Sequence, residues 1–377
     1  MSTTIDPRAK GAAAAAPAFG RFFLPGPTEV RADVLAAMTR QMIGHRGNDI
    51  ESLLARVAPR LQQIFRTTQA VYTSTSSATG LMEAGVRNAM RGRLLCLING
   101  AFSQRFHKAA INSGIVADKL EVAPGEIHTP DMLAEALHRE QYDAVTVVHS
   151  ETSTGVLNPI RELAQVAHAA GDVMVIVDTV SSMAGAPVEV DLWELDYVLT
   201  GSQKAFAVPP GLAFCTANQR MFERARASKN RGLYFDLIEF HDYWKKNQTP
   251  NTPAVSLLYA LDVQLEHIAA EGIETRWARH DAMARRTWSW ADEQRGRGLG
   301  VKVLAPDGYR SPTVTCLSAP AGKTGSQIVA AMKAKGFVIA SGYGGMKDQM
   351  VRIGHMGDHS LAELEVLLEA LGEVLAA

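Results

Sequence analysis

The chain is poor in cysteine and has no long apolar stretch, and both shortages exclude classes of protein. Its three cysteines, at 96, 215 and 316, are odd in number and far apart among 377 residues. A secreted fold built on disulfides is therefore excluded, and a reducing, cytoplasmic location is expected. The longest apolar runs, such as Val173–Val177, have the length of a strand, so no segment is expected to span a membrane.

An excess of charge of one sign is also lacking. The formal net charge is -1, and no segment concentrates Lys and Arg as a nucleic-acid-binding surface would. Any anion that the protein binds must therefore be met by a local site. Residues 1–20 contain an Ala-rich stretch without Leu or Val, which is too weakly apolar for a signal peptide and predicts a flexible N-terminal arm.

The remaining sequence is that of a globular protein with 47% hydrophobic and 20% charged residues, and its length favours two domains. Residues 21–260 alternate between helix and strand patterns. This alternation predicts a large α/β domain with a mostly parallel sheet covered by helices on both faces. Residues 261–377 predict a smaller α+β domain, and a helix carrying Val255 to Ile268 is expected to join the two.

Start signals and apolar periodicity place several elements. Asn48 with Glu51 predicts a capping box, Thr129–Pro130 predicts a second helix start, and Ser360 with Glu363 predicts a capping box ahead of the last helix. Short apolar runs of strand character occur in both predicted domains, at 70–72, 94–98, 144–148, 174–177, 197–200, 313–317, 337–340 and 350–353.

Reactive side chains follow three of these predicted strands. Thr152 comes after the strand at 144–148, Asp178 after the strand at 174–177, and Lys204 after the strand at 197–200. In an open α/β sheet, ligands bind outside the carboxyl ends of the strands, so these groups are expected to share one site. The segment Ser76–Gly80 follows another strand and begins a helix, whose N-terminal N–H groups suit a phosphate.

Pyridoxal 5′-phosphate is a cofactor that needs each of these groups. Its aldehyde needs a lysine amine, and its ring nitrogen needs an acidic partner so that the protonated ring accepts electrons. Its phosphate needs backbone N–H groups at a helix N-terminus. We therefore expect a pyridoxal phosphate site built around Lys204, Asp178 and the segment Ser76–Gly80.

The segment Ser202-Gln203-Lys204-Ala205, followed by Pro209-Pro210-Gly211, resembles the cofactor-lysine segment of class V aminotransferases. The likeness is greatest to alanine–glyoxylate and serine–pyruvate (serine–glyoxylate) aminotransferases. Further segments match in the family's order, over roughly residues 21 to 375: Pro25-Gly26-Pro27, Glu151–Val156, Val177–Ser182 and Val351–Gly354. The resemblance implies the type I fold of pyridoxal-phosphate enzymes, like that of aspartate aminotransferase, and a homodimer with active sites at the subunit interface.

The resemblance also implies roles for single residues. Lys204 would carry the Schiff base and act as catalytic acid and base, and Asp178 would pair with the ring nitrogen. The remaining cofactor contacts would come from residues around the ring and the phosphate, namely Ser77, Ala78, Thr79, Phe102, Thr152, Val180 and Gln203. Gly26 and Arg352 would contact the substrate. The guanidinium of Arg352 would bind a carboxylate through two parallel hydrogen bonds.

In this family, the dimer partner also lends phosphate contacts, from the region that matches residues 248–252. Here the sequence departs from the family's better-known members, because Gln248 and Asn251 stand where Tyr and Thr are expected. The candidates in this region are Gln248, Thr249, Asn251 and Thr252. A further departure is Thr79, where some members have His.

The expected reaction is a ping-pong transfer of an amino group from alanine or serine to glyoxylate or pyruvate. Small donors are expected because no second arginine is evident in the sequence to receive a side-chain carboxylate. Alternatives are a 2-aminoethylphosphonate or pyridoxamine transaminase, which differ by pocket side chains. A cysteine desulfurase is disfavoured because Cys316 lies in a strand pattern and the other two cysteines look buried. A non-catalytic partner subunit is disfavoured because Lys204, Asp178 and Arg352 are intact.

Simpler interpretations exist for several of these residues. Asp178 could be a turn residue, Arg352 could form a surface ion pair, and Phe102 could be part of a core. His355 and His359 are four residues apart, but no HExxH motif accompanies them, so a metal site is disfavoured. No G-x-G-x-x-G pattern begins a helix after a strand, which disfavours a dinucleotide site.

Overall fold

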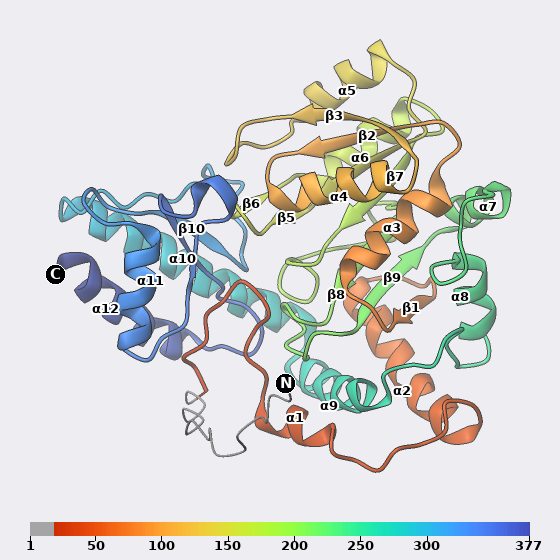
Figure 1. Ribbon diagram of the computed structural model, residues 1–377, viewed down its shortest axis with the longest axis horizontal. Helices are drawn as coiled ribbons and strands as arrows, with labels where there is room; N and C mark the ends of the chain where they lie inside the picture. The colour runs from red at the N-terminus through yellow and green to blue at the C-terminus, as the bar shows by residue number, and fades with distance from the viewer. Residues whose placement is uncertain (1–18) are drawn as a thin grey trace, which may run out of the picture.

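The computed structural model describes residues 19–377 and is organised around a seven-stranded sheet (Figure 1). The strand order is β1-β9-β8-β7-β4-β2-β3. The strands are β1 (Val71–Ser74), β2 (Arg93–Ile98), β3 (Val116–Glu121), β4 (Ala144–Val148), β7 (Met174–Asp178), β8 (Tyr197–Gly201) and β9 (Ala213–Ala217). All neighbours from β8 to β3 pair in parallel, and β9 runs antiparallel to both of its neighbours. The predicted α/β class with a mostly parallel sheet is therefore confirmed.

Helices cover both faces of this sheet because the side chains of its buried strands are apolar on both sides. Val145 and Val147 face one layer of helices, whereas Ala144 belongs to the core on the opposite face. The first layer contains α1 (Ala32–Ala37), α2 (Asn48–Phe65), α5 (Pro130–Arg139), α6 (Ile160–Ala169) and α9 (Val255–Glu271). The second layer contains α3 (Ala78–Ala89), α4 (Ala101–Asn112), α7 (Gln219–Ala227) and α8 (Leu237–Trp244).

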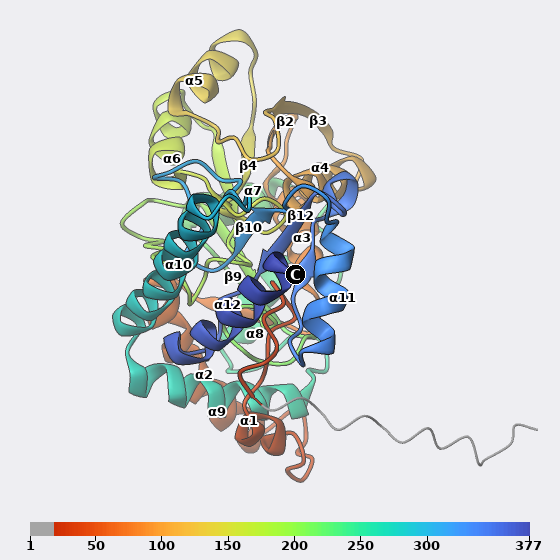
Figure 2. The same cartoon turned by 90° about the vertical axis from the view of Figure 1, so that its left-hand side faces the viewer.

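The C-terminal part of the chain forms a smaller antiparallel sheet with its own core. Its strand order is β10-β12-β11, and Figure 2 shows the accompanying helices turned toward the viewer. The elements are β10 (Thr315–Ser318), β11 (Ala340–Ser341), β12 (Met350–Ile353), α10 (Ile273–Gly296), α11 (Gly325–Ala334) and α12 (Leu361–Ala376). Phe23, from the N-terminal region, is fully buried in this core. A domain boundary at residue 260 would fall inside α9 and stays a prediction.

Most of the predicted elements are present, and the exceptions have physical causes. The strands at 144–148 and 350–353 are found with the predicted bounds, whereas the strand predicted at 337–340 shrinks to β11. The sequence interpretation missed β3, β9 and the long helix α10. The edge strand β3 carries charged residues, the half-buried Asp118 and the exposed Lys119 and Glu121, which interrupt the apolar pattern. The remaining short elements are β5 (Ser150–Glu151), β6 (Val156–Leu157) and the 3-10 turn η1 (Gly344–Met346).

One predicted capping box is wrong, and another is confirmed. The N-cap of α2 is Gly47, and Asn48 is already the first helical residue, so its side chain caps nothing. Glu51 instead accepts a hydrogen bond from Gln248 at 2.8 Å. The box at Ser360 and Glu363 is present at the start of α12. The predicted N-terminal arm lies outside the described residues, except for its last two positions.

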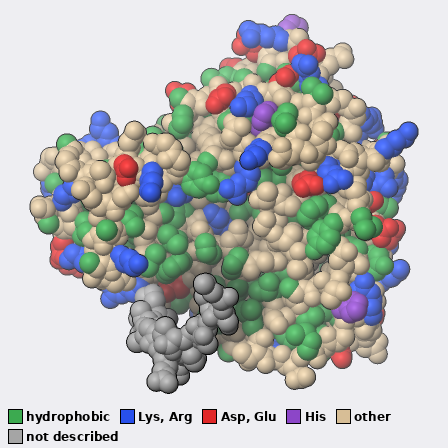
Figure 3. All heavy atoms as spheres, viewed as in Figure 1, with side chains coloured by type: hydrophobic (Ala, Val, Ile, Leu, Met, Phe, Trp, Pro, Cys, Tyr) green, Lys and Arg blue, Asp and Glu red, His purple; other side chains and the backbone are tan. Residues whose placement is uncertain are grey.

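The surface mixes charges of both signs. In the face shown in Figure 3, Lys and Arg side chains are interspersed with Asp and Glu. Within residues 19–377, no helix is both long enough and apolar enough to cross a membrane. No group of three or more metal-ligating side chains gathers in this part of the chain.

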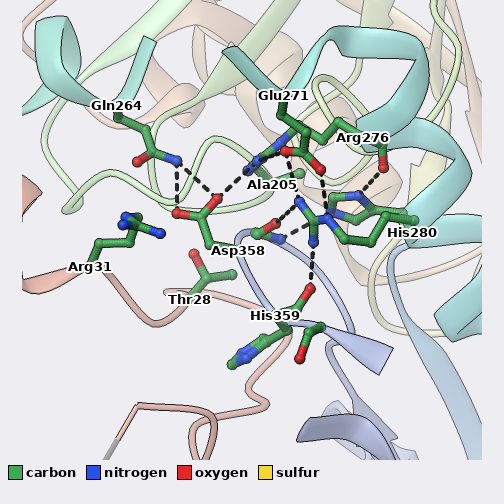
Figure 4. Close-up of polar contacts among 12 residues, drawn as sticks. Thr28, Arg31, Ala205, Gln264, Glu271, Arg276, His280, Asp358 and His359 are labelled. Atoms are coloured by element: carbon green, nitrogen blue, oxygen red, sulfur yellow. Dashed lines mark hydrogen bonds and ion pairs between the residues drawn. The ribbon is translucent and has the colours of Figure 1, made fainter. Parts of the chain in front are cut away.

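A buried arginine ties the two sheets and their helices together at their junction (Figure 4). Arg276 of α10 is 1% exposed, and its Nη1 donates to Glu271 at 2.8 Å and to Asp358 at 2.9 Å. Its Nη2 donates to the backbone carbonyl of Ala205 at 2.7 Å. Gln264 of α9 also donates to Asp358, at 2.9 Å. The guanidinium therefore holds α9, α10, the loop before α12 and the loop after β8 in one arrangement.

His280 completes this junction as a neutral side chain. Its Nδ1 donates to the carbonyl of Arg276 at 2.7 Å, and its Nε2 accepts from the backbone N–H of Gly357 at 3.1 Å. Burial holds the pKa of His280 well below its usual value, and the positive charges of Arg276 and Arg279 act in the same direction. The imidazole can therefore keep both hydrogen bonds throughout the neutral pH range.

We expect Arg276→Met to destabilise the protein strongly. The substitution leaves the buried carboxylate of Asp358 without its ion-pair partner, which typically costs about 3–5 kcal/mol. Arg285→Met, on the same helix, removes only an exposed pair with Asp281 and should change the unfolding midpoint little. Denaturant unfolding of both variants checks this expectation. Equal stability of the two would show that the junction does not depend on Arg276.

Candidate active site

A cavity of about 160 Å³ lies at the carboxyl ends of β4, β7 and β8. Ligands bind at this position in open α/β sheets. Its lining includes every cofactor-contact residue that the sequence predicts between positions 77 and 204. The lining residues are Ser77, Ala78, Thr79, Met82, Phe102, Arg105, Val148, Ser150, Thr152, Asp178, Val180, Gln203 and Lys204.

Lys204 follows β8 and is held at the cavity by the N-terminal segment. Its side chain is buried, its Nζ donates to the carbonyl of Pro25, and its own carbonyl accepts from Thr28 Oγ1 at 2.9 Å. A Cβ atom on Gly26, whose φ is +103°, would lie 2.5 Å from Lys204 Cδ. The positive φ favours glycine here, and the backbone passes directly against the lysine side chain. The predicted contact between Gly26 and the substrate stays a prediction.

The electrostatic surroundings of Lys204 favour its neutral amine. Burial lowers the pKa of Lys204 to about 7, and the positive charge of Arg352 contributes to the lowering. Asp178 and Glu151 oppose this effect, but more weakly than burial. A neutral amine is the form that attacks a carbonyl, so the site suits a lysine that bonds covalently to an aldehyde.

Asp178 ends β7 and faces the same cavity. Its Oδ1 accepts from the N–H of Val180 at 2.7 Å, whereas its Oδ2 has no hydrogen-bond partner within residues 19–377. Burial raises the pKa of Asp178 to about 7, and the nearby negative charge of Glu151 adds to the rise. A buried carboxylate with an unused oxygen fits a cationic N–H group, such as a protonated pyridine ring.

Glu151 is a structural residue of the site to which the sequence interpretation gave no role. It is fully buried, and its carboxylate accepts from the N–H groups of Phe102 and Ser103 and from the hydroxyl of Ser153. A carboxylate at a helix N-terminus is stabilised by these donors, so Glu151 fixes the start of α4 and with it Phe102. The sequence signal that could have identified Glu151 was a carboxylate three residues after a strand that is apolar except for Thr146.

The start of α3 supplies a position for a phosphate. Ser77 is its N-cap and makes no side-chain capping bond, and Ala78 is the first helical residue. The first N–H groups of a helix have no intrahelical acceptors and carry a partial positive charge. Together with the Lys204 amine and the Asp178 carboxylate, this donor set fits pyridoxal phosphate, with Ser77, Ala78, Thr79 and Gln203 placed to hold its phosphate end.

Arg352 approaches the cavity from β12 of the smaller sheet. It is 9% exposed, its Nε donates to the carbonyl of Ser341 at 2.9 Å, and its Nη1 donates to the carbonyl of Thr152 at 3.3 Å. In the described part of the chain it has no carboxylate partner, and its Nη2 makes no hydrogen bond. Phe102 stands on another side of the lysine, with its ring centroid 5.6 Å from Lys204 Nζ.

The segment that was predicted to reach a partner subunit lies apart from this cavity. Gln248 contacts Glu51, and the hydroxyl of Thr249 donates to the carbonyl of Asn251 at 2.7 Å. Thr252 is exposed. None of these residues lines the cavity of its own chain. Their contact with the site of a second subunit stays a prediction.

His355 and His359 have separate partners. His355 Nε2 is 2.8 Å from the hydroxyl of Thr315, and His355 Nδ1 is 3.1 Å from the carbonyl of Pro312. His359 stacks on Phe23, with ring centroids 4.1 Å apart.

Arg105 is a second arginine at the cavity, which the sequence interpretation missed. It lies on α4, three residues after Phe102, so both side chains point from the same face of the helix. This three-residue spacing from Phe102 was the sequence signal that could have placed Arg105 at the site. The cavity therefore does have a second arginine, while the expectation that no arginine receives a side-chain carboxylate stays a prediction.

Comparison with known proteins gives consistent matches over nearly the whole chain. A family model described as "Aminotransferase class-V" matches residues 22–342. The chain is 36% identical to an uncharacterized aminotransferase of Methanocaldococcus jannaschii, over 93% of this chain and 92% of that protein. It is 33% identical to a soluble hydrogenase small subunit of Synechococcus sp., over 94% and 92% of the two chains. It is 31% identical to a serine–glyoxylate aminotransferase of Methylorubrum extorquens, over 94% and 90%.

Solved structures give the same fold. An alanine–glyoxylate aminotransferase of Nostoc sp. superposes with a TM-score of 0.89 at 25% identity, covering 99% of this chain and 100% of that one. An aspartate aminotransferase of Thermus thermophilus gives a TM-score of 0.87 at 29% identity, covering 94% and 99%. The architecture is the type I fold of pyridoxal-phosphate enzymes, and the cofactor is pyridoxal 5′-phosphate. The chain belongs to the class V aminotransferase family and is a pyridoxal-phosphate-dependent transaminase.

Proposed function

We propose that the protein transfers an amino group from a small amino acid, alanine or serine, to glyoxylate or pyruvate. The observation that carries the proposal is the buried guanidinium of Arg352 beside Lys204, which lacks a carboxylate partner within residues 19–377. A planar guanidinium in this position suits the α-carboxylate that both the donor and the acceptor carry. The similarity to proteins named serine–glyoxylate and alanine–glyoxylate aminotransferases supports the choice of substrates.

The proposed roles follow from what each side chain can do. Bound pyridoxal phosphate supplies an electron-withdrawing ring that acidifies the Cα–H bond of the amino acid. Lys204, neutral and buried, would hold the cofactor and would serve as the positioned base that removes the proton from Cα. Asp178 would stabilise the protonated ring nitrogen. Arg352 orients the substrate, while Phe102 and Val180 would cover the two faces of the ring and exclude water.

The alternatives differ in testable chemistry. Neither 2-aminoethylphosphonate nor pyridoxamine carries an α-carboxylate, so the donor step would leave Arg352 without its role. A desulfurase would need a reactive thiolate, but burial raises the pKa of Cys96 to about 11 and those of Cys215 and Cys316 to about 12. These thiols are therefore protonated and poorly nucleophilic at neutral pH.

We further propose a homodimer in which the segment at residues 248–252 reaches the phosphate site of the partner subunit. The support is its separation from the cavity of its own chain, together with the family's use of this region. The three reduced, buried cysteines support a cytoplasmic location.

We expect Lys204→Ala to abolish covalent attachment of the cofactor and to reduce turnover by on the order of 10²–10⁴-fold, because one amine has both roles. Borohydride reduction of the wild type, followed by peptide mapping, should place the label on Lys204. Exposed Lys246 is the control, and Lys246→Ala should keep label and activity. A label at any other lysine would contradict the site assignment.

The combined contribution of Asp178 and Lys204 to the stability of the cofactor-free protein should be least favourable near pH 7, whereas buried neutral histidines such as His280 and His149 lower the stability as the medium becomes acidic. The pKa of Asp178 is raised to about 7, so between pH 4 and 7 the folded chain holds a proton that the unfolded chain releases, and stability falls as pH rises. The pKa of Lys204 is lowered to about 7, so above pH 7 the unfolded chain holds the extra proton, and stability rises with pH. Thermal unfolding of wild type and Asp178→Asn across pH 4–10 tests this. Because the histidines are common to both proteins, the difference between the two curves isolates Asp178. The wild type should gain stability relative to the Asn variant as the pH falls from 7 to 4, and a constant difference would rule out the shifted carboxyl.

We expect Arg352→Lys to lower the kcat/KM of alanine and serine by about 10- to 100-fold, because lysine keeps the charge but loses the two-pronged contact. Cofactor loading, measured by absorbance, should be unchanged, since the phosphate is held elsewhere. Arg161→Lys, an exposed change of the same type, is the control. Unaltered kinetics with alanine and serine, or 2-aminoethylphosphonate as the best donor, would exclude the proposed substrates.

A further inference from the structure

Two arginines without carboxylate partners meet at one tyrosine beside the cavity. The Cζ of Arg352 lies 5.5 Å from the centroid of the Tyr343 ring, and Nη2 of Arg105 lies 3.3 Å from the Tyr343 hydroxyl. Neither guanidinium forms an ion pair with any residue between 19 and 377. Many other arginines of the protein do, including the buried Arg224 and Arg276. The pair at Tyr343 is therefore an unneutralised cationic region.

Aromatic rings hold these two arginines in place. Phe102 and Tyr343 pack against each other with ring centroids 5.5 Å apart, and Arg105 Cζ lies 5.0 Å from the Phe102 centroid. Contacts between a guanidinium and an aromatic face are favourable, so the rings orient Arg105 and no ion pair with a carboxylate is needed. The N–H groups of Arg105 that do not face Tyr343 are left for another acceptor.

Arg105 acts electrostatically on the two reactive groups of the cavity, Lys204 and Asp178. Arg105 lines the same cavity as Lys204 and Asp178, and its positive charge lowers the pKa of both. The local carboxylates do not neutralise it. Glu151 is occupied by N–H and hydroxyl donors at the start of α4, and among residues 19–377 neither Glu151 nor Asp178 forms an ion pair with Arg105. After Arg352 receives an α-carboxylate, one cation therefore remains without a partner.

We infer that Arg105 and Tyr343 form a second carboxylate subsite, so that the enzyme also accepts donors of the aspartate and glutamate class. The side-chain carboxylate would accept from the Arg105 guanidinium and from the Tyr343 hydroxyl, while the α-carboxylate occupies Arg352. Such a donor exploits both unpaired cations, whereas alanine and serine use one. This inference rests on the proposed transamination and widens its range of donors.

The competing role for Arg105 is a contact to the cofactor phosphate. The start of α3, with Ser77 and Thr79, lines the same cavity and already offers N–H and hydroxyl donors. The two roles have different consequences. A phosphate contact affects cofactor loading equally for every donor, whereas a substrate contact affects acidic donors selectively.

The test uses the full-length protein loaded with pyridoxal phosphate. Single-turnover half-reactions with aspartate, glutamate, alanine and serine are followed by cofactor absorbance in the wild type, Arg105→Gln and Tyr343→Phe. The wild type should react with at least one acidic donor. Its selectivity for that donor over alanine should fall by about 10- to 100-fold in Arg105→Gln, as expected for a charged hydrogen-bonded contact, and by less in Tyr343→Phe.

Lys108→Gln removes an exposed charge from the same helix and is the matched control, which should keep the wild-type selectivity. The inference is overturned if the wild type reacts with alanine or serine but with neither acidic donor. It is also overturned if selectivity stays constant in both variants, including the case in which Arg105→Gln merely loses cofactor. If alanine and serine fail to react with the wild type, the proposed small donors are rejected. The inference about Arg105 is then tested by whether the Arg105→Gln variant reacts more slowly than the wild type with the acidic donors.

Discussion

The position of the reactive lysine depends on a buried guanidinium at the junction of the two sheets. Arg276 bonds the carbonyl of Ala205, directly after Lys204, and pairs with Asp358 in the loop before α12. Thr28 bonds the carbonyl of Lys204 itself. A buried charge must keep its partners, since leaving one unpaired is costly. The same contacts that avoid this cost therefore hold the lysine loop against both parts of the molecule.

Exclusion of water then determines the chemistry of the cavity. Lys204 and Asp178 are buried at the ends of neighbouring strands, and burial moves their pKa values toward each other from opposite sides. A lysine that is neutral near pH 7 suits attack on a carbonyl and removal of a proton. A carboxylic group that is raised in pKa regains its charge when a cationic ring is placed against it. Burial thus prepares both groups for the cofactor of this family.

The substrate side draws on both sheets. Arg352 comes from β12 of the smaller sheet but bonds the carbonyl of Thr152 beside β4 and β5 of the large part, so the carboxylate site exists only where the two meet. Tyr343, next to η1, joins this arginine to Arg105 of α4. Donor selection therefore depends on the relative placement of the sheets as much as on any one residue.

Local sequence patterns were enough to predict the alternation of elements, the α/β class and the placement of Thr152, Asp178 and Lys204 after their strands. These properties follow from local periodicity and from the rule that parallel strands share one carboxyl edge. Which residues distant in the chain contact one another could be read only from the folded structure. Contacts between residues far apart in the chain give Glu151 its buried role and bring Arg105, Tyr343 and Arg352 together. The same is true of the bonds by which Arg276 joins the two sheets. The prediction missed edge strand β3 and placed the cap of α2 wrongly at Asn48. In both cases the local sequence signal was weak, and packing or backbone geometry determined the structure.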